Sequence, residues 1–381
     1  MTTGPLVVLG ATGSIGRQTL DVGSSLELEV AVLAARRPGP GLVELASSHP
    51  DATVVATGGS GEERDWFLSQ VRNPVRFGTD AMLEEASTPG RTVVNGLVGS
   101  VGLRPTLAAL TAGNRVALAN KESLVAAGPL VMAAAIEHGA ELIPVDSEHS
   151  ALFQLVSGID RNDIASLVLT ASGGPFRGRT LAELRDVTPA EALAHPTWSM
   201  GRRISIDSAT LANKGLEVIE ANVLFGVPFD RIEVVVHPQS LVHSLIGLTD
   251  GSMLAHVGAT DMRIPIAYAL SHPQRSPSTV PFTLAGNRFD FEAVDRSTFR
   301  ALDLAYSAGE RGGVAPCVYN AADEIAVQAF LDGRLGFLGI ADLVERTLSA
   351  IDLVPMESVD HVLEIDRQAR ELASSLVSGA C

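Results

Sequence analysis

The chain has 381 residues, 46% of them hydrophobic and 19% charged, which is typical of a globular protein with two or three domains. Its net charge of −16 argues against a nucleic-acid partner, because such proteins normally carry a basic surface. No apolar run reaches the ~18–20 residues that span a bilayer, and the first residues lack the basic patch of a signal peptide. We therefore expect a cytoplasmic protein with no membrane partner.

The first part of the chain alternates predicted strands with helices. Residues 6–9 predict a buried strand, which is followed by a glycine-rich turn, a helix from Ser14 and a second strand at 28–35. Further strands are expected at 53–56, 92–94, 115–118 and 141–145. This alternation predicts an α/β fold with a Rossmann-like, doubly wound parallel sheet over residues 1–145.

The pattern changes after residue 145, where glycine- and proline-rich turns become frequent. Strand candidates at 166–170, 232–236 and 253–257 predict a central α+β catalytic domain over residues 146–270. Residues 271–298 carry several prolines and are expected to form a linker. Helices expected at 321–331, 339–350 and 358–375 predict a C-terminal helical bundle over residues 299–381.

The turn after the first strand is a candidate dinucleotide site. Gly10, Gly13 and Gly16 are spaced so that backbone amides at a helix N-terminus can approach a pyrophosphate. Arg36 and Arg37 follow the second strand, where NAD-specific folds carry an acidic residue. Guanidinium groups match a 2′-phosphate, so we expect NADPH rather than NADH. The alternatives are a tight turn that binds nothing and two solvated arginines.

Only two of the 28 basic residues are lysines, Lys121 and Lys214, and each follows an asparagine. A lysine ammonium is a compact point charge, whereas an arginine guanidinium is a wide planar fork. We interpret both positions as sites that need the compact cation. The alternative is the chance survival of two lysines in an arginine-rich chain.

Three carboxylates form a candidate metal site. Asp146 and Glu148 follow the strand expected at 141–145, and in an extended chain they would point to the same side and repel each other unless a cation lay between them. The third carboxylate, Glu217, belongs to the same motif as the second lysine and follows it by three residues. Carboxylate ligands suit Mg²⁺ or Mn²⁺ rather than zinc. An acidic, solvent-facing turn is the alternative, and His149 is expected to support the site rather than to bind the metal.

A phosphate site is predicted from hydroxyl, amide and ammonium groups. Residues 207–217 look like the entry to a helix, where Ser208 is either an N-cap or, with Asn213 and Lys214, a phosphate ligand. Ser172 precedes two glycines, so its turn can present backbone N–H groups to an anion. With the carboxylates, these groups predict a site for a phosphorylated polyol held on a metal.

Residues 195–201 carry Trp198, one of two tryptophans, between turn-forming residues. Such a loop predicts a lid that closes over a substrate and excludes water. A loop fixed by a buried indole is the alternative. His237 and His243 follow an expected strand, and we interpret them as supporting residues.

Taken together, these segments resemble one enzyme family over nearly the whole chain, including residues 320–324 near the C-terminus. They stand in the order seen in 1-deoxy-D-xylulose 5-phosphate reductoisomerases: Gly10–Gly16, Ala119–Ser123, Pro144–His149, Ala171–Phe176, His195–Gly201, Asn213–Glu217 and His237–Ser240. The resemblance implies NADPH-dependent isomerisation and reduction of 1-deoxy-D-xylulose 5-phosphate to 2-C-methyl-D-erythritol 4-phosphate, in non-mevalonate isoprenoid biosynthesis. It also implies a homodimer and a divalent metal, which can be Mn²⁺, Mg²⁺ or Co²⁺.

The resemblance further implies roles for matching positions. The metal ligands are Asp146, Glu148 and Glu217, and the catalytic set adds Lys121 and His195. The substrate contacts are Lys121, Ser147, Glu148, Ser172, His195, Trp198, Ser208, Asn213, Lys214 and Glu217. The cofactor contacts are Gly10, Thr12, Gly13, Ser14, Ile15, Arg36, Arg37, Asn120, Glu122 and Gly201.

The chain departs from the family pattern at two places. Residues 34–37 read Ala-Ala-Arg-Arg where the family usually has Ala-Gly-x-Asn, and Asp323 stands where the family usually has asparagine. Two other functions stay open: another metal-assisted NADPH dehydrogenase that acts without rearrangement, and a non-catalytic NADPH-binding protein. NADPH oxidation with the deoxyxylulose phosphate, with and without EDTA, separates them.

Overall fold

The computed structural model describes residues 3–198, 200–277 and 281–378. The chain forms two compact units and passes from one to the other several times. The first unit comprises Met1–Ser123, Val131–Ser150 and Asp261–Pro281, and the second comprises Leu124–Leu130, Ala151–Thr260 and Phe282–Cys381. Each unit has its own sheet, and the two are described in turn.

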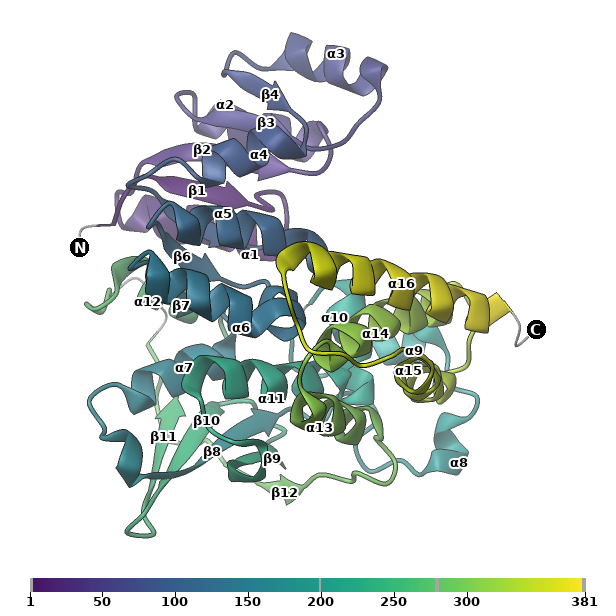
Figure 1. Cartoon of the computed structure of the whole chain (residues 1–381). Helices are drawn as coiled ribbons and strands as arrows, with labels where there is room; N and C mark the ends of the chain where they lie inside the picture. The colour runs from purple at the N-terminus through teal and green to yellow at the C-terminus, as the bar shows by residue number, and fades with distance from the viewer. Residues whose placement is uncertain (1–2, 199, 278–280, 379–381) are drawn as a thin grey trace. The chain divides into compact units, whose positions relative to one another are not determined.

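The first unit contains a seven-stranded sheet in the order β4-β3-β2-β1-β5-β6-β7, in which every pair of neighbours is parallel (Figure 1). The predicted Rossmann-like sheet is therefore confirmed. The order reverses at β1, because β2 lies on one side of it and β5 on the other. The strands are β1 (Leu6–Leu9), β2 (Val30–Ala35), β3 (Thr53–Ala56), β4 (Val75–Phe77), β5 (Thr92–Asn95), β6 (Arg115–Leu118) and β7 (Leu142–Pro144).

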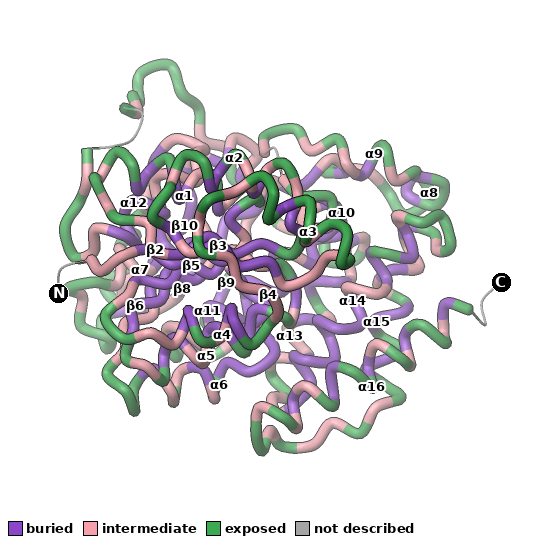
Figure 2. The backbone as a smooth tube through the Cα atoms, turned by 90° about the horizontal axis from the view of Figure 1, so that it is seen from above, coloured by how far each residue is buried: buried purple, intermediate pink, exposed green. Residues whose placement is uncertain are grey.

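Parallel strands covered by helices become buried, and β1, β5 and β6 are buried along their whole length (Figure 2). Helix α12, which follows residue 260, belongs to this unit and packs against α1. The helices are α1 (Ser14–Ser25), α2 (Pro40–Ser48), α3 (Gly61–Gln70), α4 (Thr79–Ala86), α5 (Leu103–Thr111) and α12 (Arg263–Ser271), with a short 3-10 turn at Ser100–Gly102. Helix α6 (Lys121–Glu137) contributes residues to both units and has a kink at Ala127.

The second unit contains a five-stranded mixed sheet in the order β11-β10-β8-β9-β12. Strands β8 and β9 are parallel, and the other neighbours are antiparallel. The strands are β8 (Ile164–Ala171), β9 (Ile232–Val236), β10 (Val242–Leu248), β11 (Met253–Val257) and β12 (Glu292–Ala293). The 3-10 turns are Arg161–Asp163 and Phe229–Arg231.

One hydrophobic core joins this sheet to the C-terminal helices. Leu167 of β8, Ile206, Val218, Phe330 and Ile340 all belong to it, so the segments expected as a catalytic domain and a helical domain pack around shared apolar side chains. In Figure 1, α16 lies along α14, with which it packs. The helices are α8 (Leu181–Leu184), α9 (Pro189–Leu193), α10 (Arg202–Thr210), α11 (Ala212–Phe225), α13 (Ala301–Arg311), α14 (Ala315–Leu331), α15 (Gly339–Ala350) and α16 (Val359–Ser378), and α7 (Ser147–Val156) has residues in both units.

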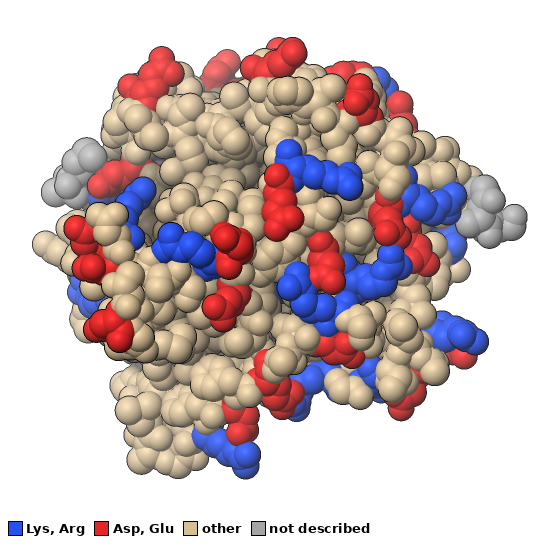
Figure 3. Space-filling view, turned by 60° about the horizontal axis from the view of Figure 1, so that its bottom comes forward, with Lys and Arg blue, Asp and Glu red and all other residues tan. Residues whose placement is uncertain are grey.

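Two observations bear on the expected partners. No helix in the described part of the chain combines the length and the apolar character needed to cross a membrane. Over the face drawn in Figure 3, Lys and Arg side chains lie among Asp and Glu side chains.

Candidate active site

The turn between β1 and α1 has a backbone that glycine alone fits easily. Gly10 has φ of +80°, and a Cβ placed on it would lie 2.6 Å from the carbonyl oxygen of Gly96. A Cβ on Gly16 would lie 2.4 Å from the carbonyl oxygen of Gly10. Helix α1 begins after Gly13 without a side-chain cap, so its first N–H groups can bind an anion at the point where the strand order reverses.

The predicted cofactor arginines directly follow β2, the neighbour of β1 in the sheet. Arg36 and Arg37 are exposed, as are Thr12 and Ser14 of the glycine turn, whereas Ile15 is half-buried. Two guanidinium groups at this end of the sheet supply the positive charge that a 2′-phosphate requires.

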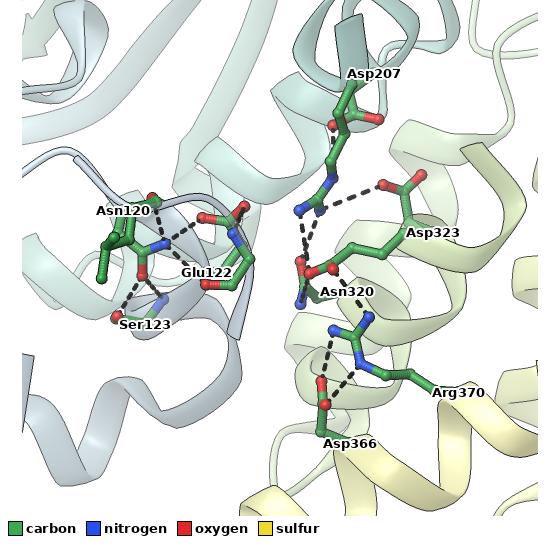
Figure 4. A network of polar contacts seen from close by, with 12 residues as sticks. Asn120, Glu122, Ser123, Asp207, Asn320, Asp323, Asp366 and Arg370 are labelled. Carbon is green, nitrogen blue, oxygen red and sulfur yellow. Dashed lines mark hydrogen bonds and ion pairs between the residues drawn. The ribbon is translucent and has the colours of Figure 1, made fainter. Parts of the chain in front are cut away.

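Asn120 and Glu122 bind the loop after β5. No pattern in the sequence indicated this contact. Asn120 caps α6 and is fully buried; its side-chain amide donates to the carbonyl oxygens of Leu97 and Gly99, at 2.9 and 3.0 Å (Figure 4). Glu122 accepts from Asn120 at 2.8 Å and from the backbone N–H of Gly99 at 2.9 Å. These two predicted cofactor contacts therefore hold a loop beside the glycine turn in a fixed conformation.

The first lysine lies beside the first carboxylate of the candidate metal set. Lys121 Nζ lies 2.9 Å from Asp146 Oδ2, and His149 Nδ1 lies 2.9 Å from Asp146 Oδ1. The expectation of an extended chain was wrong here, because β7 ends at Pro144 and α7 begins at Ser147. Asp146 instead accepts the backbone N–H of Glu148 at 3.2 Å, so the aspartate caps the helix whose first turn carries Ser147 and Glu148.

The second lysine lies beside the third carboxylate. Lys214 and Asn213 both donate to Glu217, one turn further along α11, and Lys214 and Glu217 are buried. The alternative of Ser208 as the N-cap of a helix entry is excluded. Ser208 lies in the last turn of α10, and α11 begins only after Leu211, which adopts a left-handed conformation with φ of +64°.

The Ser172 turn packs on the end of α10. Gly173 and Gly174 have φ of +85° and +65°, and a Cβ on Gly174 would lie 2.7 Å from the carbonyl oxygen of Ser208. The N–H of Gly174 donates to Ser172 Oγ at 3.2 Å. This close approach brings the Ser172 turn and Ser208 together within the second unit, as an anion site would require.

His195 connects the predicted lid to the Ser172 turn. Its Nδ1 accepts the backbone N–H groups of Thr197 and Trp198, at 3.2 and 2.9 Å, and its Nε2 lies 2.9 Å from Ser172 Oγ. Since Nδ1 accepts, the ring proton of the neutral imidazole lies on Nε2 and is donated to Ser172. Burial lowers the pKa of His195, which favours this neutral form. Gly201 ends the loop and precedes α10.

The other two histidines have structural partners. His237 is buried, lies 2.8 Å from the carbonyl oxygen of Asp290 through Nδ1, and stacks on Phe291 with ring centroids 4.8 Å apart. His243 lies 3.3 Å from the carbonyl oxygen of Ala259, and its pKa is lowered mainly by burial. These contacts agree with the supporting part that we expected for both residues.

Three family models match the chain. The model of 1-deoxy-D-xylulose 5-phosphate reductoisomerase matches residues 6–128, that of the same enzyme's C-terminal domain matches residues 142–225, and that of the DXP reductoisomerase C-terminal domain matches residues 257–372. Curated 1-deoxy-D-xylulose 5-phosphate reductoisomerases from Desulforamulus reducens and Ralstonia pickettii are both 47% identical to the chain. The first alignment covers 97% of the chain and 98% of the relative, and the second covers 99% and 98%.

Solved structures agree. The Zymomonas mobilis enzyme in complex with NADPH is 42% identical, with a TM-score of 0.90 and 99% of both chains covered. A DOX-P reductoisomerase in complex with NADPH, fosmidomycin and magnesium is 36% identical, with a TM-score of 0.90 and 98% of both chains covered. The Rossmann-like sheet and these relatives define an NADP-dependent oxidoreductase. The chain belongs to the 1-deoxy-D-xylulose 5-phosphate reductoisomerase family, as its motifs predicted.

Proposed function

We propose that this protein catalyses the NADPH-dependent isomerisation and reduction of 1-deoxy-D-xylulose 5-phosphate to 2-C-methyl-D-erythritol 4-phosphate, in isoprenoid biosynthesis. Membership of the family carries this proposal, because the relatives span almost the whole chain at close to half identity. An NADPH dehydrogenase that acts without rearrangement is less well supported, because the relatives that span almost the whole chain are named reductoisomerases. The same relatives argue against a non-catalytic NADPH-binding protein.

We propose that NADPH binds at the turn between β1 and α1. The structure supports this through Gly10 and Gly16, where a side chain would collide with backbone atoms, and through the uncapped start of α1. Arg36 and Arg37 would bind the 2′-phosphate. Asn120 and Glu122 would act partly through the loop after β5 that they hold.

Asp146, Glu148 and Glu217 are proposed to hold the divalent cation. The donor set fits a hard cation, since all three ligands are carboxylates and no thiolate or imidazole is needed. Asp146 is paired with Lys121 and Glu217 with Lys214, and these two ion pairs support positions that attract positive charge. When bound, such a cation stabilises the negative charge that develops on the oxygens of the reacting ketone and hydroxyl.

The chain's own groups would orient the substrate. Lys121 and Ser147 are proposed to contact its oxygen-bearing carbons, and Ser172, Ser208, Asn213 and Lys214 to hold its phosphate. The Ser172 turn against the end of α10 supports the second assignment. Phosphate binding away from the reacting carbons supplies orientation, and can also drive closure of the loop that carries His195 and Trp198.

The oxidation of NADPH, followed by its absorbance, tests this function with the deoxyxylulose phosphate as substrate. We expect turnover with Mg²⁺ or Mn²⁺ and none after EDTA, and identification of the product by mass spectrometry and NMR separates rearrangement from simple reduction. Turnover that is indifferent to EDTA, or a product with the unbranched skeleton, would overturn the proposal. We also propose a homodimer and a cytoplasmic location, which size-exclusion chromatography and fractionation can check.

A further inference from the structure

A buried ionic cluster in the second unit connects α10 to α14 (Figure 4). Arg203, the second residue of α10, donates to Asn320 Oδ1 at 3.1 Å and lies 3.1 Å from Glu324 Oε1. The same guanidinium lies 3.5 Å from Asp207 Oδ2 and 3.8 Å from Asp323 Oδ2. Asp207 and Asp323 are almost completely buried. We call these five residues the Arg203 cluster.

The cluster continues to α16 through a second guanidinium. Arg370 lies 2.9 Å from Glu324 Oε2 and 2.7 Å from Asp366 Oδ2, so the two arginines share Glu324, one at each carboxylate oxygen. Burial opposes the charge on Glu324, but Arg203 and Arg370 together lower its pKa. The two arginines differ in the helices that they join: Arg203 connects α10 to α14, whereas Arg370 connects α14 to α16.

Arg203 lies in the first turn of α10. It follows Gly201, the last residue of the predicted lid, by two positions, and α10 begins without a side-chain cap. Ser208 lies near the far end of the same short helix, and its carbonyl oxygen lies close to Gly174 of the Ser172 turn. A nine-residue helix is close to rigid, so an anchor at its start sets the place of the group at its end.

We propose that Arg203 is a positioning residue for the phosphate of the substrate: by binding α14 it fixes α10, and with it Ser208 and the end of the lid. The inference rests on the proposed function, because α10 matters to catalysis only if it holds that phosphate. A planar guanidinium suits this task, since it reaches an amide and several carboxylates in fixed directions at once. Asp323, where the family usually has asparagine, adds one negative charge to the anchor.

The test compares Arg203→Met with Arg370→Met in the full-length protein. Both changes remove a guanidinium from Glu324, but only the first removes it from α10. We expect Arg203→Met to raise the KM for the deoxyxylulose phosphate by about tenfold or more, as for the loss of hydrogen bonds to charged groups. The KM for NADPH should stay unchanged. We expect Arg370→Met to lower the melting temperature and to leave both KM values at those of the parent.

Milder variants keep the test decisive. If Arg203→Met does not fold, Arg203→Lys takes its place, because lysine keeps the charge but loses the fork; a raised substrate KM supports the proposal and a parental KM overturns it. Asp323→Asn should raise the substrate KM less than Arg203→Met does. If the parental enzyme turns over, and Arg203→Met lowers the stability without changing the substrate KM, this inference alone is overturned. A parental enzyme without turnover overturns the proposed function, and this inference with it.

Discussion

The two ring nitrogens of His195 permit a test that separates the shape of the lid from its contact with the Ser172 turn. Nδ1 accepts two backbone N–H groups, and Nε2 meets Ser172. Asparagine places its side-chain oxygen close to where Nδ1 lies, whereas glutamine places its amide nitrogen close to where Nε2 lies. His195→Asn should therefore keep the turn of the lid, and His195→Gln should keep the contact with Ser172.

The expected magnitude follows from the hydrogen bonds that each variant loses. One hydrogen bond contributes about 0.5–1.5 kcal/mol, so losing both Nδ1 bonds in His195→Gln costs about 1–3 kcal/mol. A free-energy change of about 1–3 kcal/mol corresponds to roughly 5- to 150-fold in an equilibrium constant. We expect kcat/KM for the deoxyxylulose phosphate to fall by that factor in His195→Gln, and to fall less in His195→Asn, which loses one hydrogen bond.

Initial rates of NADPH oxidation measure these effects. Fluorescence of Trp198 measures the lid itself, once the other tryptophan is removed as Trp66→Phe. We expect the emission of Trp198 to change in His195→Gln and to stay near that of the parent in His195→Asn. His195→Ala, which loses all three bonds, gives the lower limit. The role of Nδ1 in the lid would be refuted if His195→Gln kept the parental activity and emission while His195→Asn lost as much activity as His195→Ala.

Three further predictions concern stability and the cofactor. Burial lowers the pKa of His243, so the folded state favours its neutral form; stability should fall as the pH drops below the unfolded-state value of about 6.5 and level off below the folded-state pKa. His243→Gln should flatten this part of the plot of melting temperature against pH, and an unchanged slope would contradict the assignment. Gly16→Ala should cost about 1–3 kcal/mol of unfolding free energy and raise the KM for NADPH, since its Cβ would meet backbone atoms. Gly61→Ala, with open space around its Cβ, is the matched control and should behave as the parent in urea unfolding and in kinetics. Replacing Arg36 and Arg37 by alanine should reduce the preference for NADPH over NADH by about ten- to a hundredfold, as for about 1.4–2.8 kcal/mol of lost interaction. The preference is measured as the ratio of kcat/KM for NADPH to kcat/KM for NADH. An unchanged ratio would remove both arginines from the 2′-phosphate site.

Much of the fold follows from local patterns in the chain. The spacing of Gly10, Gly13 and Gly16 after an apolar strand predicted β1, α1 and β2, because glycine positions and hydrophobic runs are local signals. Strands β3, β6, β9 and β11 also match their expected bounds. The family was predicted from seven ordered motifs, and the comparisons confirmed it.

What the sequence missed depends on contacts between distant segments. Strand β4 is three half-buried residues long, and β10 carries His243, Ser244 and Gly247, so neither shows a clear apolar pattern. The break between α10 and α11 falls at Leu211, a residue type that rarely adopts a left-handed conformation and so marks no turn. The Arg203 cluster brings together residues more than a hundred positions apart, and a single sequence holds no signal for that.

The proposed reaction requires one divalent cation that is shared by carboxylates from two separate motifs. We would titrate the full-length protein with Mn²⁺ and detect binding by calorimetry and by electron paramagnetic resonance. These measurements give the number of Mn²⁺ sites and their affinity. Asp146→Asn and Glu217→Gln each remove one ligand from a different motif. If the cation is shared in this way, the parent has one tight site and both variants lose most of their affinity for Mn²⁺. Unchanged Mn²⁺ binding in either variant, in a protein that still melts cooperatively, would contradict this shared site.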